Sequence, residues 1–444
     1  DGVIDLDNIN GVAGSYQFIG TEEYDWASRS VSSAGDVDGD GLDDLLIGAR
    51  YADGGGQDSG ETYLVTAAAL ADADAADGTT DGVIDLDNIK GVAGSYQFIG
   101  TESSDYAGIS VSSAGDVDGD GQDDLLIGAN LAGGGGSSSG ETYLVTAAAL
   151  ATADAADGAT DGVIDLDNIK GVAGSYQFIG TEAYDFAGFS VSSAGDVDGD
   201  GQDDLLIGAY GADGGGARSG ETYLVTATAL ATADAADGTT DGVIDLDNIK
   251  GVAGSYQFIG TESDDLTGWS VSSAGDVDGD GLDDLLIGAY QADGGGLNSG
   301  ETYLVTAAAL ASADAADGTT DGVIDLDNIN GVAGSYQFIG TQADDYAGIS
   351  VSSAGDVDGD GWDDLLIGAY KADGGGTDSG ESYLLFAADL AAMDAADGTT
   401  DGVIDLDNAN TSTAVVSPVV LDLDGDGVEY STDGVRFDAN GDGD

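Results

Sequence analysis

Residues 30–49 read SVSSAGDVDGDGLDDLLIGA, and this stretch decides the fold. It returns at 110–129, 190–209, 270–289 and 350–369, and only the residue at the position of Leu42 changes. The surrounding sequence repeats with it as an 80-residue unit, which occurs five times, over 1–80, 81–160, 161–240, 241–320 and 321–400. Units of this size at a fixed period are typical of repeat architectures, in which each unit buries its apolar face on its neighbours. A different, acidic segment follows at 401–444.

Each repeat contains four short segments with strand patterns, separated by turns rich in Gly and Asp. In the first repeat they are Ser15–Gly20, Ser30–Gly35, Asp44–Ala49 and Glu61–Thr66. Four antiparallel strands per repeat are the composition of a propeller blade. The sequence therefore predicts an all-β protein, a β-propeller of four-stranded antiparallel blades. The alanine-rich start of the connector at 67–88 predicts a turn or two of helix.

The charge of the chain excludes several classes of function. Its 86 acidic and 8 basic residues give a formal net charge of −78. So few basic residues form no binding face for nucleic acid or for anionic membranes, and no apolar run is long enough to span a bilayer. The chain has no His and no Cys, which excludes the usual catalytic triads. We therefore expect no enzyme, although paired carboxylates can hydrolyse glycosides.

The turn between the second and third strands has the residue pattern of a calcium loop. Asp36, Asp38 and Asp40 stand at loop positions 1, 3 and 5, the carbonyl of Leu42 at position 7, and Asp44 at position 9. Ca²⁺ takes six to eight oxygen ligands in flexible geometry, whereas Mg²⁺ demands a tight octahedron and softer metals prefer the missing His and Cys. The corresponding predicted ligands of the other repeats are Asp116, Asp118, Asp120, Gln122 and Asp124; Asp196, Asp198, Asp200, Gln202 and Asp204; Asp276, Asp278, Asp280, Leu282 and Asp284; and Asp356, Asp358, Asp360, Trp362 and Asp364.

The same residues resemble the FG-GAP repeat of integrin alpha-subunit propellers and of large bacterial surface proteins. The resemblance covers all five repeats through SVSSAGDVDGDG and DDLLIGA, and it implies a propeller fold with calcium in the DxDxDGxxD loop. The name-giving FG pair reads Ala27-Ser28 in the first repeat and Ala187-Gly188 in the third. The family usually closes a ring of seven blades.

Ring closure depends on the two ends of the repeat array. Ser15–Gly20 belongs to the outer edge of a blade whose other strands are missing upstream, and no such strand follows Glu381–Phe386. We favour a ring of five blades in which Tyr16–Ile19 pairs with Ser382–Leu385, because an open edge invites aggregation. The alternatives are an open arc or part of a seven-bladed ring, with Ala414–Leu421 as a cap on the last blade.

Two further segments are candidates for calcium. The connector places Asp77, Asp81 and Asp85 at positions 1, 5 and 9 of an EF-hand-like loop, for which solvated turns are the alternative. The tail resembles calcium-binding segments of secreted bacterial proteins of the RTX-associated kind, although the RTX nonapeptide is missing. Its predicted ligands are Asp422, Asp424, Asp426, Val428 and Asp433.

The repeats differ mainly at positions 23–29 and 50–58 of the unit. Because antiparallel strands alternate in direction, both segments are expected on one edge of each blade, with the calcium loop and connector on the opposite edge. Aromatic residues in an acidic surface suit a glycan or protein ligand, whereas unconstrained loop drift is the alternative. The candidate ligand-binding residues are Tyr24, Trp26, Tyr106, Phe186, Trp269 and Tyr346.

These observations lead to three functional hypotheses. The first is an extracellular or cell-surface calcium-binding module for adhesion or ligand binding. The second is a calcium-stiffened spacer within a large surface protein. The third is a non-catalytic propeller attached to a polysaccharide-active enzyme. Ca²⁺ is the expected cofactor in all three.

Overall fold

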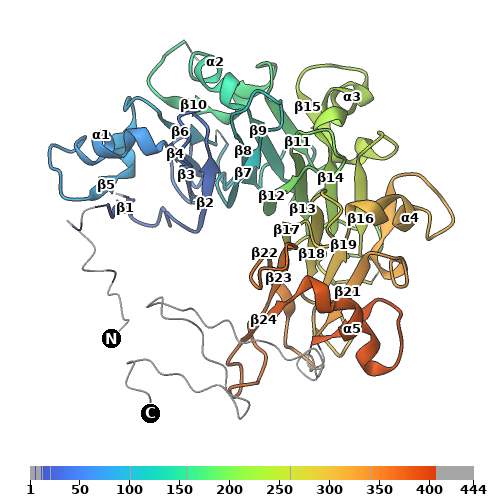
Figure 1. Cartoon of the computed structure of the whole chain (residues 1–444). Coiled ribbons are helices and arrows are strands. Elements are labelled where there is room, and N and C mark those ends of the chain that lie inside the picture. The colour runs from blue at the N-terminus through green and yellow to red at the C-terminus, as the bar shows by residue number, and fades with distance from the viewer. Residues whose placement is uncertain are drawn as a thin grey trace, which may run out of the picture.

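The structure is a computed structural model of the 444-residue chain, and it describes residues 14–406, except residues 21, 101, 157, 261 and 341, together with residues 6 and 12. Within this range it is mostly β-strand, with short helices in the connectors. The strands are grouped into sheets that follow one another along the chain (Figure 1). The predicted all-β, β-propeller class is confirmed.

Five kinds of strand recur along the described chain. The innermost strand has the sequence SVSSAG and occurs as β2 (Ser30–Gly35), β7 (Ser110–Gly115), β12 (Ser190–Gly195), β17 (Ser270–Gly275) and the longer β22 (Ala347–Gly355). The second has the sequence DLLIGA and occurs as β3 (Asp44–Ala49), β8 (Asp124–Ala129), β13 (Asp204–Ala209), β18 (Asp284–Ala289) and β23 (Asp364–Ala369). The third is β4 (Glu61–Val65), β9 (Glu141–Val145), β14 (Glu221–Val225), β19 (Glu301–Val305) and β24 (Glu381–Leu385). The fourth is β1 (Gln17–Ile19), β6 (Ser95–Ile99), β11 (Tyr176–Ile179), β16 (Tyr256–Ile259) and β21 (Ser335–Ile339). The fifth is β5 (Val83–Asp85), β10 (Val163–Asp165), β15 (Val243–Asp245), β20 (Val323–Asp325) and β25 (Val403–Asp405).

Blades 1 to 3 each take their strands from three consecutive repeats, and blade 4 takes its fifth strand, β25, from the segment that follows the repeats. The first blade has the order β2, β3, β4, β6, β10, in which the first three strands come from one repeat, β6 from the next and β10 from the one after. The first four strands pair antiparallel, as the sequence predicts, and β10 adds in parallel to β6. We number the blades 1 to 5 by their innermost strands, β2, β7, β12, β17 and β22.

The fifth strand was missed in the sequence because it has only three residues. It lies in the connector, where the carboxylate of buried Asp74 accepts a hydrogen bond from the Gly82 N–H at 2.8 Å and positions the segment that follows. Gln17 then pairs with Val83 and Ile19 with Asp85. The prediction of four strands per blade is therefore short by one parallel strand.

The predicted helical turn at the start of the connector is confirmed. A 3-10 turn leads into a five-residue α-helix in each described connector, and none of these helices is long and apolar enough to cross a membrane. The 3-10 turns are η2 (Ala67–Ala69), η4 (Ala147–Ala149), η6 (Ala227–Ala229), η9 (Ala307–Ala309) and η11 (Ala387–Asp389), and the helices are α1 (Leu70–Asp74), α2 (Leu150–Asp154), α3 (Leu230–Asp234), α4 (Leu310–Asp314) and α5 (Leu390–Asp394). Further 3-10 turns are η3 (Leu86–Ile89), η5 (Leu166–Ile169), η7 (Ala235–Asp237), η8 (Leu246–Ile249), η10 (Leu326–Asn328) and η12 (Ala395–Asp397).

The blades form an open arc, with β1 near one end and β24 near the other (Figure 1). Among the described strands, β24 pairs with β23 and β1 pairs with β5. The predicted pairing of Tyr16–Ile19 with Ser382–Leu385 is therefore wrong, and the alternative of an open arc is correct. The physical reason is that the turn from each blade to the next does not complete a circle in five blades.

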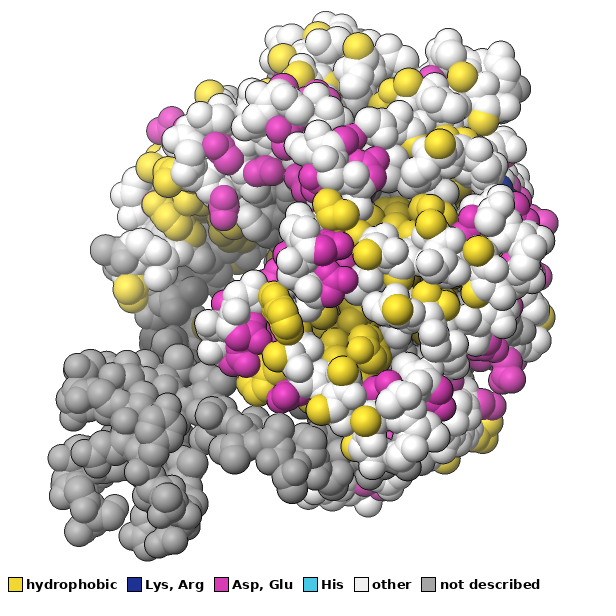
Figure 2. Space-filling view, turned by 45° about the vertical axis from the view of Figure 1, so that its right-hand side comes forward, with side chains coloured by type: hydrophobic (Ala, Val, Ile, Leu, Met, Phe, Trp, Pro, Cys, Tyr) yellow, Lys and Arg dark blue, Asp and Glu magenta, His cyan; other side chains and the backbone are white. Residues whose placement is uncertain are grey.

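Hydrophobic clusters join each blade to the next. One cluster packs Ala34, Leu46 and Leu64 of blade 1 against Val111 and Ile127 of blade 2, and three equivalent clusters join the later blades. Seen from one face, carboxylates spread over the blades around a hollow in which hydrophobic side chains gather (Figure 2). Because the core lies between blades, the stability of each blade depends on its neighbours.

Candidate metal and ligand sites

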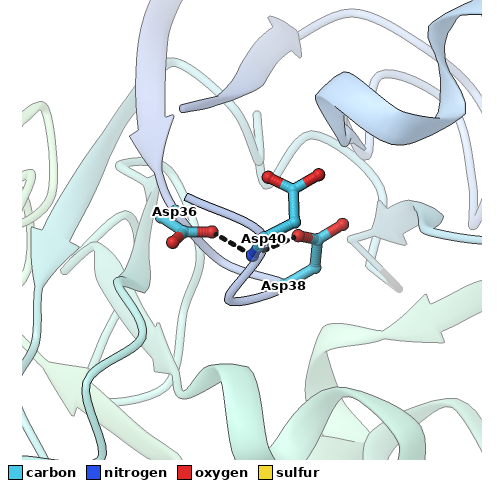
Figure 3. Close-up of side chains that lie close together, drawn as sticks. All are labelled: Asp36, Asp38 and Asp40. Carbon is cyan, nitrogen blue, oxygen red and sulfur yellow. Dashed lines mark hydrogen bonds between the residues drawn. The ribbon is translucent and has the colours of Figure 1, made fainter. Parts of the chain in front are cut away.

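The aspartate loop between the first two strands of blade 1 is a compact turn held by its own side chains. The carboxylate of Asp36 accepts hydrogen bonds from the Asp40 N–H at 3.0 Å and the Gly41 N–H at 2.9 Å, and Asp38 accepts one from the Asp40 N–H at 3.1 Å (Figure 3). The positive φ of Gly41, 87°, permits the sharp turn. The three carboxylates are thereby gathered within one short loop.

Each of the five loops brings three carboxylate oxygens within 4.8 Å of one another. In every loop the first two members are the aspartates at positions 1 and 3. The third member differs, and it is at position 5 in the first and last loops and at position 9 in the three central loops. The groups are Asp36, Asp38 and Asp40; Asp116, Asp118 and Asp124; Asp196, Asp198 and Asp204; Asp276, Asp278 and Asp284; and Asp356, Asp358 and Asp360.

The aspartate at position 9 also connects the loop to the rest of the blade. Asp44 is fully buried, and its carboxylate accepts hydrogen bonds from the Val37 N–H at 3.1 Å and the Ala67 N–H at 2.8 Å. One bond holds the loop and the other holds the start of the connector. The aspartate loop and the connector therefore lie on the same edge, as the sequence predicts.

The aspartate clusters are electrostatically strained without a cation. Burial raises the pKa of Asp124 to about 7, and repulsion from Asp118 adds to the increase, against an opposing hydrogen bond from the Ala147 N–H. Burial likewise raises the pKa of Asp204 and of Asp284 to about 7. A bound cation stabilises the charged form of such carboxylates. An all-oxygen group of this kind fits a hard cation such as Ca²⁺.

The residues at loop position 7 take part through their backbone and vary in their side chains. The N–H groups of Leu42 and Trp362 donate to the carboxylates of Asp40 and Asp360 at 2.9 Å. The same bond is made by Gln122, Gln202 and Leu282. These bonds hold position 7, at which the sequence predicts a carbonyl ligand, close to position 5.

A neighbouring aspartate, whose role the sequence analysis did not assign, clamps consecutive blades together. The carboxylate of Asp123 in blade 2 accepts a hydrogen bond from the Asp36 N–H of blade 1 at 2.7 Å, and its own N–H donates to the Asp36 carbonyl at 3.0 Å. Gly35, next to this contact, has φ of 73°, and a Cβ there would clash with the Asp123 carboxylate. The clamp recurs as Asp203 on Asp116, Asp283 on Asp196 and Asp363 on Asp276. The first residue of each of these aspartate loops is therefore positioned by the following blade.

The two variable segments meet on the opposite edge, as the sequence predicts. The ring centroids of Trp26 and Tyr51 lie 4.8 Å apart, and Tyr51 lies 4.8 Å from Tyr106 of the next blade. The Arg50 guanidinium lies 4.6 Å from the centre of the Tyr51 ring. Trp26 is 54% exposed, so this aromatic group reaches solvent.

In blades 3 to 5 the rings form one continuous row, which we call the aromatic row. It comprises Phe186, Tyr210, Phe189, Trp269, Tyr290, Tyr346 and Tyr370, with successive centroids 4.4 to 5.7 Å apart. Lys371 lies 4.6 Å from the centre of the Tyr346 ring. The predicted residues Phe186, Trp269 and Tyr346 are thus brought together, whereas Tyr24 is exposed and has no aromatic contact among the described residues. The linking tyrosines were missed, although positions 50 and 51 of the unit, where they stand, were recognised as variable.

The backbone holds several of these rings in an uncommon conformation. Trp26, Tyr106, Phe186 and Tyr346 have φ between 50° and 60°. Bulky residues with positive φ are outliers that persist only where surrounding contacts hold them, and they are concentrated at functional sites. The equivalent Leu266 has φ of 58°, so this conformation is common to the loop in all five repeats and carries an aromatic side chain in four of them.

Below the variable loops, blades 3 and 4 each have an acidic pocket. In blade 3 it has a cavity of about 130 Å³, lined by Glu182, Asp185, Asp213, Glu221, Asp247 and Lys250. Burial raises the pKa of Asp185 to about 7, and its carboxylate accepts a hydrogen bond from the Glu182 N–H at 2.9 Å. The carboxylate of Glu221 accepts a hydrogen bond from the Tyr223 hydroxyl.

This pocket predicts a pH-dependent stability. Folding raises the pKa of Asp185 above its ordinary value of 3.8, so the folded state holds a proton that the unfolded state has lost between about pH 4 and pH 7. The free energy of unfolding should therefore fall as the pH rises through this window. We expect Asp185→Asn, which keeps the acceptor for the Glu182 N–H, to stabilise the protein by roughly 1–2 kcal/mol at pH 8 and by less than half as much at pH 5.

Chemical denaturation at both pH values measures this difference. Asp72→Asn, on the exposed surface of α1, is the matched control and should show no such pH-dependent gain. An equal effect of Asp185→Asn at pH 5 and pH 8 would contradict the prediction.

The calcium predictions for the connector and for the tail have different outcomes. The Asp77 carboxylate accepts hydrogen bonds from the N–H at 2.7 Å and the hydroxyl at 2.8 Å of Thr79, and Asp81 accepts one from the Val83 N–H at 3.2 Å. These separate turns match the alternative of solvated turns, and the connector aspartates are not among the converging groups of the described residues. The predicted tail ligands Asp422, Asp424, Asp426, Val428 and Asp433, and the predicted cap Ala414–Leu421, lie outside the described residues.

Comparison with known proteins agrees with this geometry. The sequence model of one family, described as the FG-GAP repeat, matches residues 28–65, 107–145, 187–225, 267–305 and 347–385. The chain is similar to integrin alpha pat-2 of Caenorhabditis elegans, with 27% identity over 274 residues, and to integrin alpha-5 of Xenopus laevis, with 29% identity over 217 residues. These alignments cover 61% and 48% of this chain but only 18% and 17% of the two relatives.

Proposed function

The chain contains five FG-GAP repeats, and from this premise we propose that it is an extracellular calcium-binding module that binds a protein ligand through the aromatic row and the variable loops around it. The observation that carries the proposal is that three carboxylates converge in each of the five loops. The FG-GAP repeats and the integrin alpha relatives point to a non-catalytic binding module. An extracellular location is consistent with calcium, which such modules bind at about 10⁻⁴–10⁻³ M.

Calcium would act here as a structural cation. The predicted ligands at loop positions 1, 3, 5 and 9 would hold it, and the cation would supply positive charge to a group of carboxylates that burial and mutual repulsion disfavour. The clamp by Asp123 transmits the order of the loop to the next blade, because it binds the backbone of Asp36. Calcium binding and blade stacking therefore support each other.

The ligand face is proposed on three properties of the aromatic row. Its rings are contiguous across three blades and partly exposed, and two of its residues, Phe186 and Tyr346, have positive φ. Aromatic side chains provide large contact area at low entropic cost, and they are enriched at interfaces with proteins. Arg50 and Lys371 lie beside rings in a chain with few basic residues, which adds a positive group at each end of the arc.

A binding screen tests this face. We expect the calcium-loaded protein to bind members of a panel of extracellular proteins and Trp269→Ala to bind them at least about tenfold more weakly, because truncated aromatic anchors lose more than 1 kcal/mol. Asp72→Ala is the control, because it truncates an exposed side chain of α1, in the connector on the opposite edge and outside the aspartate loops. A glycan array run in parallel identifies a sugar ligand instead. If both variants bind the ligand equally well, the aromatic row is not the ligand-binding surface.

A calcium-stiffened spacer is the second candidate, and the clamps favour it. In a spacer, calcium would change the stiffness of the arc and leave ligand binding undetected in both screens. Small-angle scattering with and without EDTA measures that change in shape. A ligand whose binding depends on Trp269 decides for the first candidate.

A further inference from the structure

The hydrophobic clusters of this protein are each assembled from two halves. The trailing face of a blade supplies Ala34, Val37, Leu46 and Leu64 or their equivalents, and the leading face of the next blade supplies the equivalents of Val31, Leu45 and Ile47. Four described clusters contain both halves, and the cluster of blade 1 contains residues such as Ile47 and Tyr63 but no trailing half. Each end of the arc therefore presents one half of an interface.

Exposure of equivalent residues shows these two half-interfaces directly. On the leading face of blade 1, Val31 is 63% exposed, whereas its equivalent Val111 is 5% exposed. On the trailing face of blade 5, Leu366 is 40% and Leu384 is 38% exposed, whereas their equivalents in the other blades are fully buried. The same side chains that form the core elsewhere thus face solvent at the two ends.

The polar contacts between blades also have one half at each end. The Ser30 hydroxyl oxygen accepts a hydrogen bond from the Val111 N–H at 3.0 Å, and the series continues to Ser270 and Val351 at 3.1 Å. The Asp clamps have the same direction, since each binds the preceding blade. The first is Asp123 of blade 2, which binds blade 1, and the last is Asp363 of blade 5, which binds blade 4. Blade 5 carries the groups that a following blade would contact, which are the Ser350 hydroxyl and the backbone of Asp356. Blade 1 carries the groups that would contact a preceding blade, which are the Val31 N–H and the Asp43 carboxylate.

The outer strands repeat this complementarity. Blade 5 consists of β22, β23 and β24 among the described strands, without the fourth and fifth strands that the other blades have. At the other end, β1 and β5 pair with each other but with no third strand among the described residues. Residues 15–19 have the same sequence, SYQFI, as residues 95–99, which pair with β4. The missing strands of blade 5 are therefore those that the start of the chain carries.

We propose that the trailing face and outer edge of blade 5 bind the leading face of blade 1 and the β1–β5 pair of a second copy of this chain, head to tail. The occupant is a second copy because this chain carries every complementary part, while its own two ends lie apart in the arc (Figure 1). The contact is heterologous, so it builds a ring of copies or an extending assembly. By analogy with Leu64 and Tyr96, the expected register places Leu384 opposite Tyr16 of the second copy.

Cysteine cross-linking tests this register, because the natural chain has no Cys. We expect equal amounts of Leu384→Cys and Tyr16→Cys proteins, mixed in calcium at physiological salt, to form a disulfide-linked dimer of one of each. Replacing Tyr16→Cys by Gln17→Cys, one residue out of register, should reduce this product about tenfold, because adjacent strand residues point to opposite faces.

The double variant Leu384→Cys/Tyr16→Cys distinguishes the competing outcomes. A ladder of covalent oligomers supports the proposal, whereas a cross-linked monomer shows closure within one molecule and overturns it. Sedimentation of the wild-type protein provides an independent measurement, in which the mean mass should rise with concentration and Leu384→Asp should abolish the rise. Circular dichroism of Leu384→Asp serves as the control that this variant is folded. A wild-type mass that stays monomeric at all concentrations, with no cross-link in either mixture, also overturns the proposal.

Discussion

Removal of calcium with EDTA should lower the melting temperature by more than about 15 °C. At a free calcium concentration of ~100 times the dissociation constant, each independent site stabilises the folded state by about 2.7 kcal/mol, and the described chain has five such loops. The strained carboxylates, such as Asp124 with its raised pKa, lose their compensating charge when the cation leaves. Mg²⁺ should restore little of the loss, because it demands a tighter octahedron. Differential scanning calorimetry with EDTA, then with each metal, makes the measurement.

Single-site variants connect this effect to the loops. Asp198→Asn should release one equivalent of bound calcium and remove part of the thermal shift, because Asp198 belongs to one converging group. Asp77→Asn is the matched control in the connector, where the carboxylate makes only a local turn with Thr79, and it should retain all bound calcium. Melting curves that are identical with and without EDTA would contradict the assignment of calcium to these loops.

Gly115→Ala should cost about 3–5 kcal/mol of unfolding free energy. Gly115 has φ of 73°, and a Cβ there would clash with the Asp203 carboxylate that clamps blade 3 to Asp116. The positive φ alone costs roughly 1–2 kcal/mol for Ala, while the clash and the lost hydrogen bond to a charged group add about 2–3 kcal/mol. Because Asp116 is the first residue of its calcium loop, calcium affinity at that loop should fall as well.

Gly355→Ala provides the control within the same chain. Gly355 has a similar φ of 68° and precedes the equivalent loop residue Asp356, but a Cβ there meets no atom within 4 Å. At high dilution, where separate copies do not associate, this variant should show only the backbone cost of about 1–2 kcal/mol. Chemical denaturation of both variants isolates the clamp, and equal losses would show that the contact between blades contributes nothing.

The sequence alone determined the features that depend on neighbours along the chain. The strand segments, the helical turn after Thr66 and the gathering of Asp36, Asp38 and Asp40 follow from local spacing, since each arises within one strand, turn or hairpin. The repeat period is read directly from the sequence. Strand direction also placed the variable segments on one edge and the aspartate loops on the other. These predictions needed no knowledge of how blades stack.

The tertiary structure decided the features that depend on residues far apart in sequence. The Asp123 clamp joins residues separated by 87 positions, and β10 completes a blade that begins two repeats earlier. The rings of Tyr51, Tyr210 and Tyr290 extend the aromatic contacts because consecutive blades bring their loops together. The open arc results from the angle between stacked blades, which is set by packing across the interface and leaves no periodic signal within a repeat.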